Sequence, residues 1–404
     1  MEETLADSVS RRLWKMEGEA FLESARRRTG LGDFGFPPIK PALPILASSI
    51  EREANLHPLG RFLIWNHLRG LLETRLRLTE LWNRNLAGLK NSPIERPIFI
   101  TGMPRSGSTF LHELLAQDLN NRAPLVWEVM FPFPLTRPGS REQRKRIRQT
   151  AACLWGFRWI SPRADSVHPL RATTPHECIA MHSYTLLSQE FATILNVPGY
   201  EAFLDAIDLA PAYAWEKRFL QHLQGPGSVK QWVLKSPDHA FSMEALFNVF
   251  PDAIVIQTHR NPFEVLKSCA RLTEVLRRTF ARPADRKQAG EREAGLIAKG
   301  LDRVTRFRDS HPELSDRFLD LSYQQITFDP LGAIRQVYRW LDLPLTDKTT
   351  ERVRTLAAAR SRYSRYGSEP APADFGIDRE RERARFRNYC ERFGIASQPA
   401  EGIP

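Results

Sequence analysis

The sequence predicts a three-layer α/β fold, in which a central parallel β-sheet is flanked by helices and a helical extension precedes the sheet. Two observations predict it. From Ile98 onward, short apolar runs rich in β-branched residues alternate with segments of helical spacing, which is the pattern of successive strand–helix–strand units. Before them, residues 55–89 repeat apolar side chains at helical spacing with charges between them, which indicates a helical lead-in.

The N-terminal extension is expected to consist of helices joined by loops. Helices are predicted around residues 9–28 and from Asn55 to Leu89, and the proline-rich stretch from Gly35 to Pro44 is interpreted as a connecting loop. We therefore divide the chain into residues 1–93, a helical extension packed on the core, and residues 94–404, the α/β domain.

The strands of the α/β domain are predicted from four apolar runs. These runs are Ile98–Ile100, Trp232–Leu234, Ala253–Gln257 and Arg317–Leu321. Ligands of open parallel sheets bind at the carboxyl ends of the strands. A glycine-rich loop follows the first run, Lys235 follows the second and Arg260 lies just beyond the third. All three are therefore expected on one rim, around a single site.

The first strand runs into a glycine-rich loop, Gly102–Thr109 (GMPRSGST), and then into the helical segment Phe110–Leu115. The G-x-x-x-x-G spacing wraps backbone N–H groups and a helix N-terminus around a phosphate-like group. An ATPase or GTPase carries lysine where this chain has Ser108, and the cation here is Arg105. Because a guanidinium grips a tetrahedral oxyanion at two points, the loop suits a terminal sulfate or phosphate. The candidate binding residues are Arg105, Ser106, Gly107, Ser108 and Thr109.

A second anion site is predicted after the strand Ala253–Gln257. A magnesium-dependent NTPase would be expected to end this strand in a metal-binding aspartate, whereas here Arg260 follows and Ser268 lies eight residues further on. Two separated anion sites without a metal carboxylate indicate a nucleotide with two anionic groups, and no metal is expected.

These residues carry a family resemblance. PRSGST and THRNP-x₅-S resemble the 5′-phosphosulfate loop and the 3′-phosphate motif of sulfotransferases that use 3′-phosphoadenosine 5′-phosphosulfate (PAPS), most strongly the branch common in bacteria. Further segments resemble that branch in the same order: Trp127–Glu128, Pro175–Cys178, Leu234–His239, the helix Leu331–Leu343, Arg362–Tyr363 and Asp374–Gly376. The resemblance implies a P-loop NTPase-like fold and in-line transfer of a sulfuryl group from PAPS to a hydroxyl or amine.

The resemblance also implies roles for the nucleotide-binding residues. Arg105 and the loop would hold the phosphosulfate and neutralise charge on the leaving phosphate, and Arg260 with Ser268 would hold the ribose 3′-phosphate. Arg362 and Tyr363 would close over the nucleotide from the C-terminal part of the chain.

Lys235 ends an apolar strand, where an unpaired ammonium would be costly to bury. It is a candidate for stabilising the bridging oxygen or the sulfuryl group, and a structural ion pair is the alternative. His239 is expected in the first turn of the next helix, facing the same rim, where a capping or packing role is the commoner one.

The acceptor hydroxyl needs a base, and four residues between the first two core strands are candidates: Glu177, His176, His168 and Glu128. We favour Glu177 because its P-x-E-C context is similar to the family's P-E-E segment. Pro175 at the first helical position would place His176 and Glu177 in the first turn, where an acidic residue also complements the helix dipole. His168 is the next choice, since an imidazole titrates near neutral pH.

The acceptor is expected to be a small molecule, a lipid or a glycan. The middle third of the chain is aromatic, and aromatic-lined clefts suit phenols, sterols or lipid hydroxyls, although most aromatic clusters are core. The residues concerned are Trp127, Phe131, Phe133, Trp155, Phe157, Trp159, Tyr184 and Phe191. The basic run Arg137–Arg148 is interpreted as an exposed helix face, with contact to an acidic or lipid acceptor as the alternative.

Composition narrows the partners. The 58 Lys and Arg exceed the 47 Asp and Glu by 11, which favours acidic ligands, but the basic residues are scattered and no nucleic-acid-binding module accompanies them. The four cysteines lack metal-ligand spacing, and no run approaches the roughly 20 apolar residues of a membrane span. A cytoplasmic protein is expected, and the oligomeric state is left open.

Two other functions remain compatible with the sequence. A P-loop kinase or NTPase would explain the glycine loop. The missing lysine in the loop and the missing aspartate at the strand end count against this alternative. A non-catalytic nucleotide- or glycan-binding protein on the same fold would keep the binding loops and lack turnover.

Overall fold

A five-stranded parallel sheet organises the protein. The computed structural model describes residues 4–85, 88, 92–167, 169–225, 230–360 and 372–395. The strand order is β2–β3–β1–β4–β5, and every neighbouring pair is parallel. The strands are β1 (Ile98–Gly102), β2 (Asn121–Arg122), β3 (Gln231–Lys235), β4 (Ile254–His259) and β5 (Phe318–Ser322). The four predicted strands are confirmed, and β2 was not predicted because its two residues carry no apolar run.

Helices account for most of the remaining chain. Those before β3 are α1 (Leu5–Leu13), α2 (Gly18–Thr29), α3 (Ala42–Glu53), α4 (Pro58–Arg84), α6 (Ser108–Leu115), α7 (Val126–Met130), α8 (Arg141–Ile160), α9 (Pro162–Val167), α10 (Ile179–His182), α11 (Glu190–Ile194), α12 (Pro198–Ala206) and α13 (Ala210–Gln224). Those after it are α14 (Met243–Val249), α15 (Pro262–Arg278), α16 (Arg286–Ser310), α17 (Tyr323–Phe328), α18 (Pro330–Trp340), α19 (Asp347–Arg360) and α20 (Arg379–Arg392). Short 3₁₀ turns are η1 (Ser183–Thr185), η2 (Pro237–Phe241), η3 (Pro312–Arg317) and η5 (Pro372–Phe375).

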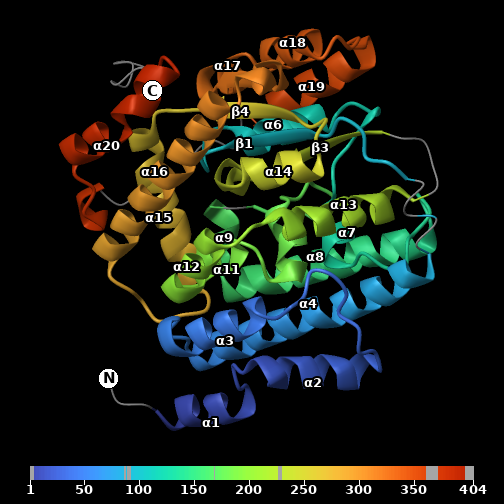
Figure 1. Ribbon diagram of the computed structural model, residues 1–404, viewed down its shortest axis with the longest axis vertical. Coiled ribbons are helices and arrows are strands. Elements are labelled where there is room, and N and C mark those ends of the chain that lie inside the picture. The colour runs from blue at the N-terminus through green and yellow to red at the C-terminus, as the bar shows by residue number, and fades with distance from the viewer. Residues whose placement is uncertain are drawn as a thin grey trace.

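The sheet is covered on both faces, as a parallel sheet requires. Successive residues of β1 point to opposite faces: Ile98 and Ile100 pack with α6, α18 and α19, whereas Phe99 belongs to the larger core that includes α4, α13 and α14. A third cluster joins α15, α16 and α20. In Figure 1 the helices α17 to α19 lie above the sheet, and α7, α8 and α13 lie between the sheet and the blue N-terminal helices. The predicted three-layer α/β architecture is confirmed.

The N-terminal helices differ in detail from the prediction. The helix predicted over residues 9–28 is two helices, α1 and α2, because the backbone leaves the helical region at Trp14 and becomes extended at Glu17. The long helix begins only at Pro58, since Asn55 adopts a left-handed φ of 48° and Leu56 forms a bridge with Ala281. Helix α3 begins inside the predicted loop. Among the described residues, no helix is long and apolar enough to cross a membrane.

The start of α4 is locked against the segment after α15, and this contact makes a test of the packing. A Cβ at Gly60 would lie 1.7 Å from the carbonyl oxygen of Phe280, which is itself held by the backbone N–H of His57. We expect Gly60→Ala to lower the free energy of unfolding by about 2 kcal/mol or more, because backbone has to move. Denaturant unfolding of both proteins measures this difference.

Gly70 on the same helix is the matched control. A Cβ there meets no atom within 4 Å, so Gly70→Ala should raise the free energy of unfolding by about 1 kcal/mol through helix propensity alone. Equal effects of the two substitutions would contradict the close packing of α4 on Phe280.

Candidate active site

The glycine loop at the carboxyl end of β1 is fastened to the neighbouring strand. Gly102 has a φ of 139°, and a Cβ there would lie 2.3 Å from Thr258 Oγ1, so only glycine fits. Ser106 is fully buried, and its hydroxyl lies 2.6 Å from Thr258 Oγ1 and donates to the carbonyl of Met103. These contacts fix the loop on β4. The side chain of Ser106 therefore braces the loop and does not line the cavity described below.

On its other side the loop has the backbone geometry expected of an anion cradle. Gly107, with a φ of 89°, is the N-cap of α6, whose first N–H groups have no intrahelical acceptor. Arg105 also takes a left-handed φ of 69° and is exposed. Arg105, Gly107, Ser108 and Thr109 line one cavity. The predicted oxyanion cradle therefore has the backbone geometry that its sequence pattern implies.

Arg260 reaches the cradle from the end of β4. Its guanidinium lies 4.0 Å from the centre of the Tyr323 ring and donates to the carbonyl of Arg105 at 3.1 Å. It also pairs with Glu264 at 3.3 Å. Tyr323, at the start of α17, was not singled out from the sequence, although its position two residues after the predicted fourth strand could have pointed to it. Ser268 lies on α15, half-buried, and is not among the residues that line the cavity.

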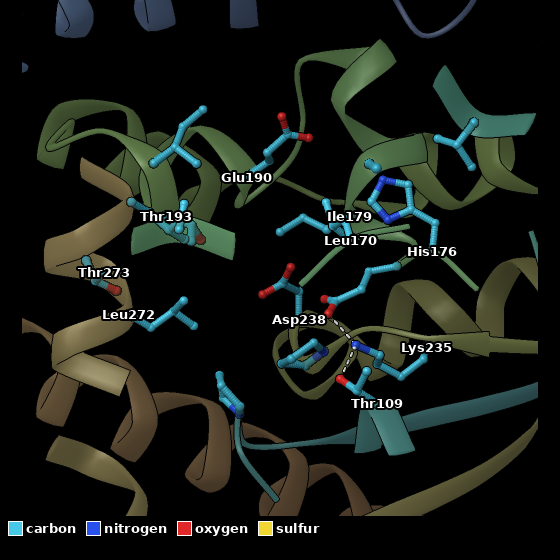
Figure 2. Close-up of a pocket in the computed structure, with 18 of the residues that line it drawn as sticks. Thr109, Leu170, His176, Ile179, Glu190, Thr193, Lys235, Asp238, Leu272 and Thr273 are labelled. Carbon is cyan, nitrogen blue, oxygen red and sulfur yellow. Dashed lines mark hydrogen bonds and ion pairs between the residues drawn. The ribbon is translucent and has the colours of Figure 1, made fainter. Parts of the chain in front are cut away.

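Lys235 and Glu177 form a buried ion pair beside the cradle. The backbone N–H of Cys178 donates to the carbonyl of Lys235 at 2.9 Å, which holds the segment before α10 against the end of β3. Lys235, 2% exposed, pairs with Glu177 and donates to Thr109 Oγ1 at 3.2 Å, the latter contact marked by a dashed line in Figure 2. The ammonium of Lys235 thus contacts both the hydroxyl of Thr109 in the loop and the carboxylate of Glu177, the favoured base.

The position of Glu177 in a first helical turn was predicted wrongly. Pro175 forms a bridge with Leu125, the N–H of His176 donates to the carbonyl of Pro124, and α10 begins only at Ile179. Glu177 therefore belongs to a non-helical segment, and its side chain is directed at Lys235 instead of capping a helix.

The other base candidates are separated by the structure. His176 lines the cavity and points toward its interior in Figure 2. Glu128 accepts from the N–H of Leu125 and pairs with Arg122 at 3.2 Å, and burial raises the pKa of its carboxyl. It does not line the cavity. His168, like Arg362 and Tyr363, lies outside the described residues.

His239 is a packing residue behind the site. It is fully buried, its Nδ1 lies 2.8 Å from the hydroxyl of Tyr213, and its ring meets Phe99 edge to face. Burial lowers the pKa of His239 to about 3, so the ring is neutral. The rim-facing position considered for it is therefore wrong, and the packing role is confirmed.

Asp238 is a lining residue that the sequence reasoning missed. It lies beside Lys235 in Figure 2, and its backbone N–H and one carboxylate oxygen both contact the hydroxyl of Ser236. Burial, together with the charge of Glu177, raises its pKa to about 7. Its position in the sequence, three residues after the strand-end Lys235 and one before His239, could have marked it as a site candidate. The site thus holds two carboxyl groups and one ammonium.

One cavity of about 1010 Å³ connects the cradle to an apolar chamber. Lys235, which contacts Thr109 of the loop, lines this cavity together with Glu177 and Asp238. The chamber beyond is lined mainly by apolar side chains of α4, α8, α15 and α16, among them Leu63, Ile64, Leu71, Leu154, Phe157, Leu272, Leu276, Leu296, Ile297 and Leu301. Of the predicted aromatic residues, Phe131, Phe133, Phe157 and Tyr184 line it. Trp127 and Phe191 are core, and Trp155 and Trp159 are exposed outside it.

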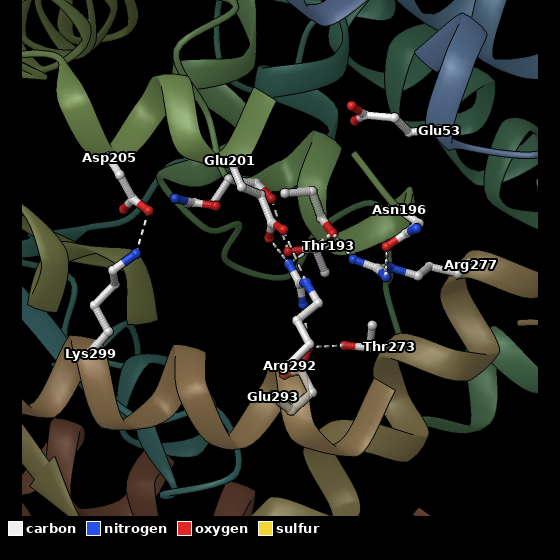
Figure 3. Close-up of polar contacts among 12 residues, drawn as sticks. Glu53, Thr193, Asn196, Glu201, Asp205, Thr273, Arg277, Arg292, Glu293 and Lys299 are labelled. Carbon is white, nitrogen blue, oxygen red and sulfur yellow. Dashed lines mark hydrogen bonds and ion pairs between the residues drawn. The ribbon is translucent and has the colours of Figure 1, made fainter. Parts of the chain in front are cut away.

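Paired charges close the far side of the chamber. Arg292 on α16 pairs with Glu201 on α12 and with Glu293, which accepts from Thr273 at 3.1 Å. Arg277 on α15 donates to Asn196 and to the carbonyl of Ala192. Figure 3 shows these contacts bridging α15 and α16 to the α11–α12 region. Arg292, Glu293 and Thr273 line the cavity, so the charges at this end are neutralised by partners within the protein.

The fold and the site together indicate a group-transfer enzyme of the P-loop-like class, with a glycine loop at the carboxyl edge of a parallel sheet and an apolar chamber opposite it. A model of the sulfotransferase family matches residues 97–347, which is more than half of the chain, and the protein belongs to this family. It is therefore a sulfotransferase, and the kinase or NTPase alternative is not favoured.

Relatives of known name extend the comparison. The omega-hydroxy-beta-dihydromenaquinone-9 sulfotransferase Stf3 of Mycobacterium bovis, and that of Mycobacterium tuberculosis, is 28% identical over 303 residues, covering 70% of this chain and 73% of the relative. The sulfotransferase STF1 of M. tuberculosis superposes with a TM-score of 0.80 at 29% identity, over 92% of this chain and 98% of that one. STF9 of Mycobacterium avium gives 0.83 at 26% identity, over 94% and 97%.

The raised pKa of Asp238 predicts how stability depends on pH. Between about pH 4 and pH 7 the folded state keeps a proton on Asp238 that the unfolded chain has lost, so this residue makes the free energy of unfolding fall as the pH rises. Asp238→Asn should remove that part of the fall. The stability of the variant relative to the wild type should then be higher at about pH 8 than at about pH 5, by about 1 to 3 kcal/mol.

Denaturant unfolding at the two pH values measures this difference. Asp316→Asn, at an exposed position on η3, is the control. A stability difference for Asp238→Asn that is the same at both pH values would show that Asp238 is ionised in the folded protein across this range.

Proposed function

We propose that this sulfotransferase takes its sulfuryl group from PAPS and transfers it to the hydroxyl of an uncharged, lipid-like acceptor. One observation carries the proposal. A single cavity runs from the anion cradle, past Lys235 and Glu177, into an apolar chamber whose charged residues are largely paired within the protein. A donor and an acceptor that enter from the two halves of this cavity meet at the ion pair.

The cradle and Arg260 support PAPS as the donor. Arg105 and the N-terminus of α6 form one anion site, and Arg260, fixed on Tyr323 and on the carbonyl of Arg105, forms a second cation beside it. These suit the 5′-phosphosulfate and the 3′-phosphate respectively. Ser268, Arg362 and Tyr363 remain further predicted contacts of the nucleotide.

The ion pair supports a division of the chemistry. Attack by the acceptor oxygen on sulfur forms one S–O bond and breaks the bond to the 5′-phosphate, while the acceptor proton goes to a base. Glu177 lies at the mouth of the apolar chamber and is the proposed base. Lys235, held between Thr109 and Glu177, is placed to neutralise the charge that develops on the leaving phosphate. His176 is the alternative base, because it lines the same cavity.

The lining of the chamber supports an acceptor with an apolar body. Side chains such as Leu272 and Ile179 face the space in Figure 2, and a charged acceptor would be left without a partner beside the Arg292 cluster. The Stf3 relative is named for an acceptor of this chemical kind, a hydroxylated menaquinone derivative.

The donor assignment is tested by calorimetric titration with 3′-phosphoadenosine 5′-phosphate, ADP and Mg·ATP. We expect a clear preference for the 3′-phosphorylated nucleotide. Arg260→Ala should weaken its binding by about 10- to 100-fold, because a hydrogen-bonded charge pair is lost, and should leave ADP binding nearly unchanged. Arg354→Ala, at an exposed helix position, is the control. Equal or tighter binding of Mg·ATP would contradict the donor assignment.

The base assignment is tested with Glu177→Gln, which keeps the size of the side chain and removes its basicity. The rate of PAPS-dependent sulfation of a long-chain primary alcohol should fall by about 10²- to 10⁴-fold, with the dissociation constant of 3′-phosphoadenosine 5′-phosphate nearly unchanged. A thermal melt of the variant establishes that it is folded. His176→Gln is the parallel variant: a large loss of rate there, with Glu177→Gln active, would transfer the role of base to His176.

A further inference from the structure

Helix α8 carries an outward stripe that does not belong to the active site. Residues 141, 145, 148, 152, 155 and 159 follow each other at spacings of three and four, so they share one face of the helix, and all six are exposed. Arg141, Lys145 and Arg148 occupy the first half of this stripe. Trp155 and Trp159, 58% and 74% exposed, occupy the second half, with their rings edge to face at 5.6 Å.

The opposite face of the same helix is a wall of the cavity. Leu154, Phe157 and Arg158 line the apolar chamber. Arg158 stands three residues after Trp155 and so lies beside it on the helix; it lines the cavity with its side chain 35% exposed, so the edge of the cavity reaches the surface next to the tryptophan pair. One helix therefore separates the acceptor chamber from a surface with two exposed indoles.

The charge around this surface is predominantly positive. Residues 137–163 contain eight Lys and Arg and one acidic residue, Glu142, which gives a net charge of +7. Large apolar side chains exposed together mark an interaction site, and a basic surface favours an anionic partner. Tryptophan is enriched where membrane meets water, and a helix with basic residues and tryptophan on its outer side suits a position in the plane of a lipid surface.

We propose that the outward face of α8 docks the enzyme on an anionic lipid bilayer. The basic half contacts the head groups, the indoles of Trp155 and Trp159 enter the interface, and the cavity edge at Arg158 lies against the membrane. An apolar acceptor then passes from the bilayer into the chamber without crossing water. The docking itself rests on the stripe, and only the passage of the acceptor rests on the proposed function.

A bilayer accounts for this surface better than an acidic protein does. The indoles lie at the end of the stripe where the cavity edge opens, and the basic side chains lie along the first half of the helix. The whole stripe, from residue 141 to residue 159, is about 27 Å long at 1.5 Å per residue. A flat, extended anionic surface meets both halves at once, and long basic side chains can reach head groups while the helix lies in the interface.

The test is co-sedimentation of the full-length protein with vesicles of phosphatidylcholine alone and of phosphatidylcholine mixed with phosphatidylglycerol. We expect binding to the anionic vesicles that weakens as salt is added. The double variant Lys145→Ser with Arg148→Ser should weaken it by about 25-fold, about five-fold for each charge. Trp155→Ala with Trp159→Ala should weaken it by about ten-fold or more. Phe328→Ala, which removes a 67% exposed aromatic side chain on α17, should leave it unchanged.

Three outcomes would overturn the docking. These are no binding of the wild type to anionic vesicles, equal binding by the tryptophan variant, and an equal loss in Phe328→Ala. The first would assign the stripe to a protein partner. All variants concern exposed side chains, and unchanged melting temperatures would exclude unfolding as the cause of a loss.

A second readout separates this inference from the proposed function. The tryptophan variant should sulfate a short, water-soluble alcohol at the wild-type rate and lose activity only on a long-chain alcohol presented in anionic vesicles. Vesicle binding by a protein that sulfates neither acceptor would contradict the proposed function and leave the docking intact. Wild-type activity of the variant on the vesicle-borne acceptor would overturn the role of α8 in delivery.

Discussion

The candidate active site depends on one backbone hydrogen bond, from the N–H of Cys178 to the carbonyl of Lys235. It attaches the segment before α10 to the carboxyl end of β3, and so brings a carboxylate from the long insertion between β1 and β3 next to the ammonium at the sheet edge. Lys235 is nearly fully buried, and an unpaired ammonium there would cost several kcal/mol. The position of the segment before α10 against β3 thus determines whether the buried ammonium of Lys235 has a carboxylate partner.

The buried pair is poorly explained by stability alone. Desolvating two charges costs about as much as their attraction returns, and apolar residues of similar size are often at least as stabilising. What an apolar pair would not supply is a cation in contact with the cradle hydroxyl of Thr109 and a carboxylate facing the chamber. Asp238, whose pKa burial raises to about 7, adds a second carboxyl group to this small volume. A role in the reaction therefore explains this cluster of buried charges better than a role in packing does.

The sequence predicted the parts of the site that are contiguous in the chain. The loop from Gly102 to Thr109 carries its geometry in its own residues, and the positive φ values of Gly102 and Gly107 follow from their type. It did not predict that Ser106 faces β4, because Thr258 lies more than 150 residues away. Glu177 was assigned to a helical turn because Pro175 often starts one, and only the tertiary bridge to Leu125 overrides that preference. The split of the first helix and the two-residue β2 likewise leave no periodic signal.

The difference between contiguous motifs and residues brought together by tertiary contacts also explains why the donor is easier to infer than the acceptor. The glycine loop, Lys235 and Arg260 each lie at the carboxyl end of a strand of one sheet, so their short motifs determine where they meet. The apolar chamber proposed for the acceptor is assembled from α4, α8, α15 and α16, which span more than two hundred residues. Each helix contributes a few apolar side chains that resemble ordinary core residues in the sequence. Substitutions on those helices can reshape the chamber without touching the cradle. Acceptor preference can therefore change within this fold while the donor site stays fixed, and a helix such as α8 can acquire an outer face suited to wherever its acceptor resides.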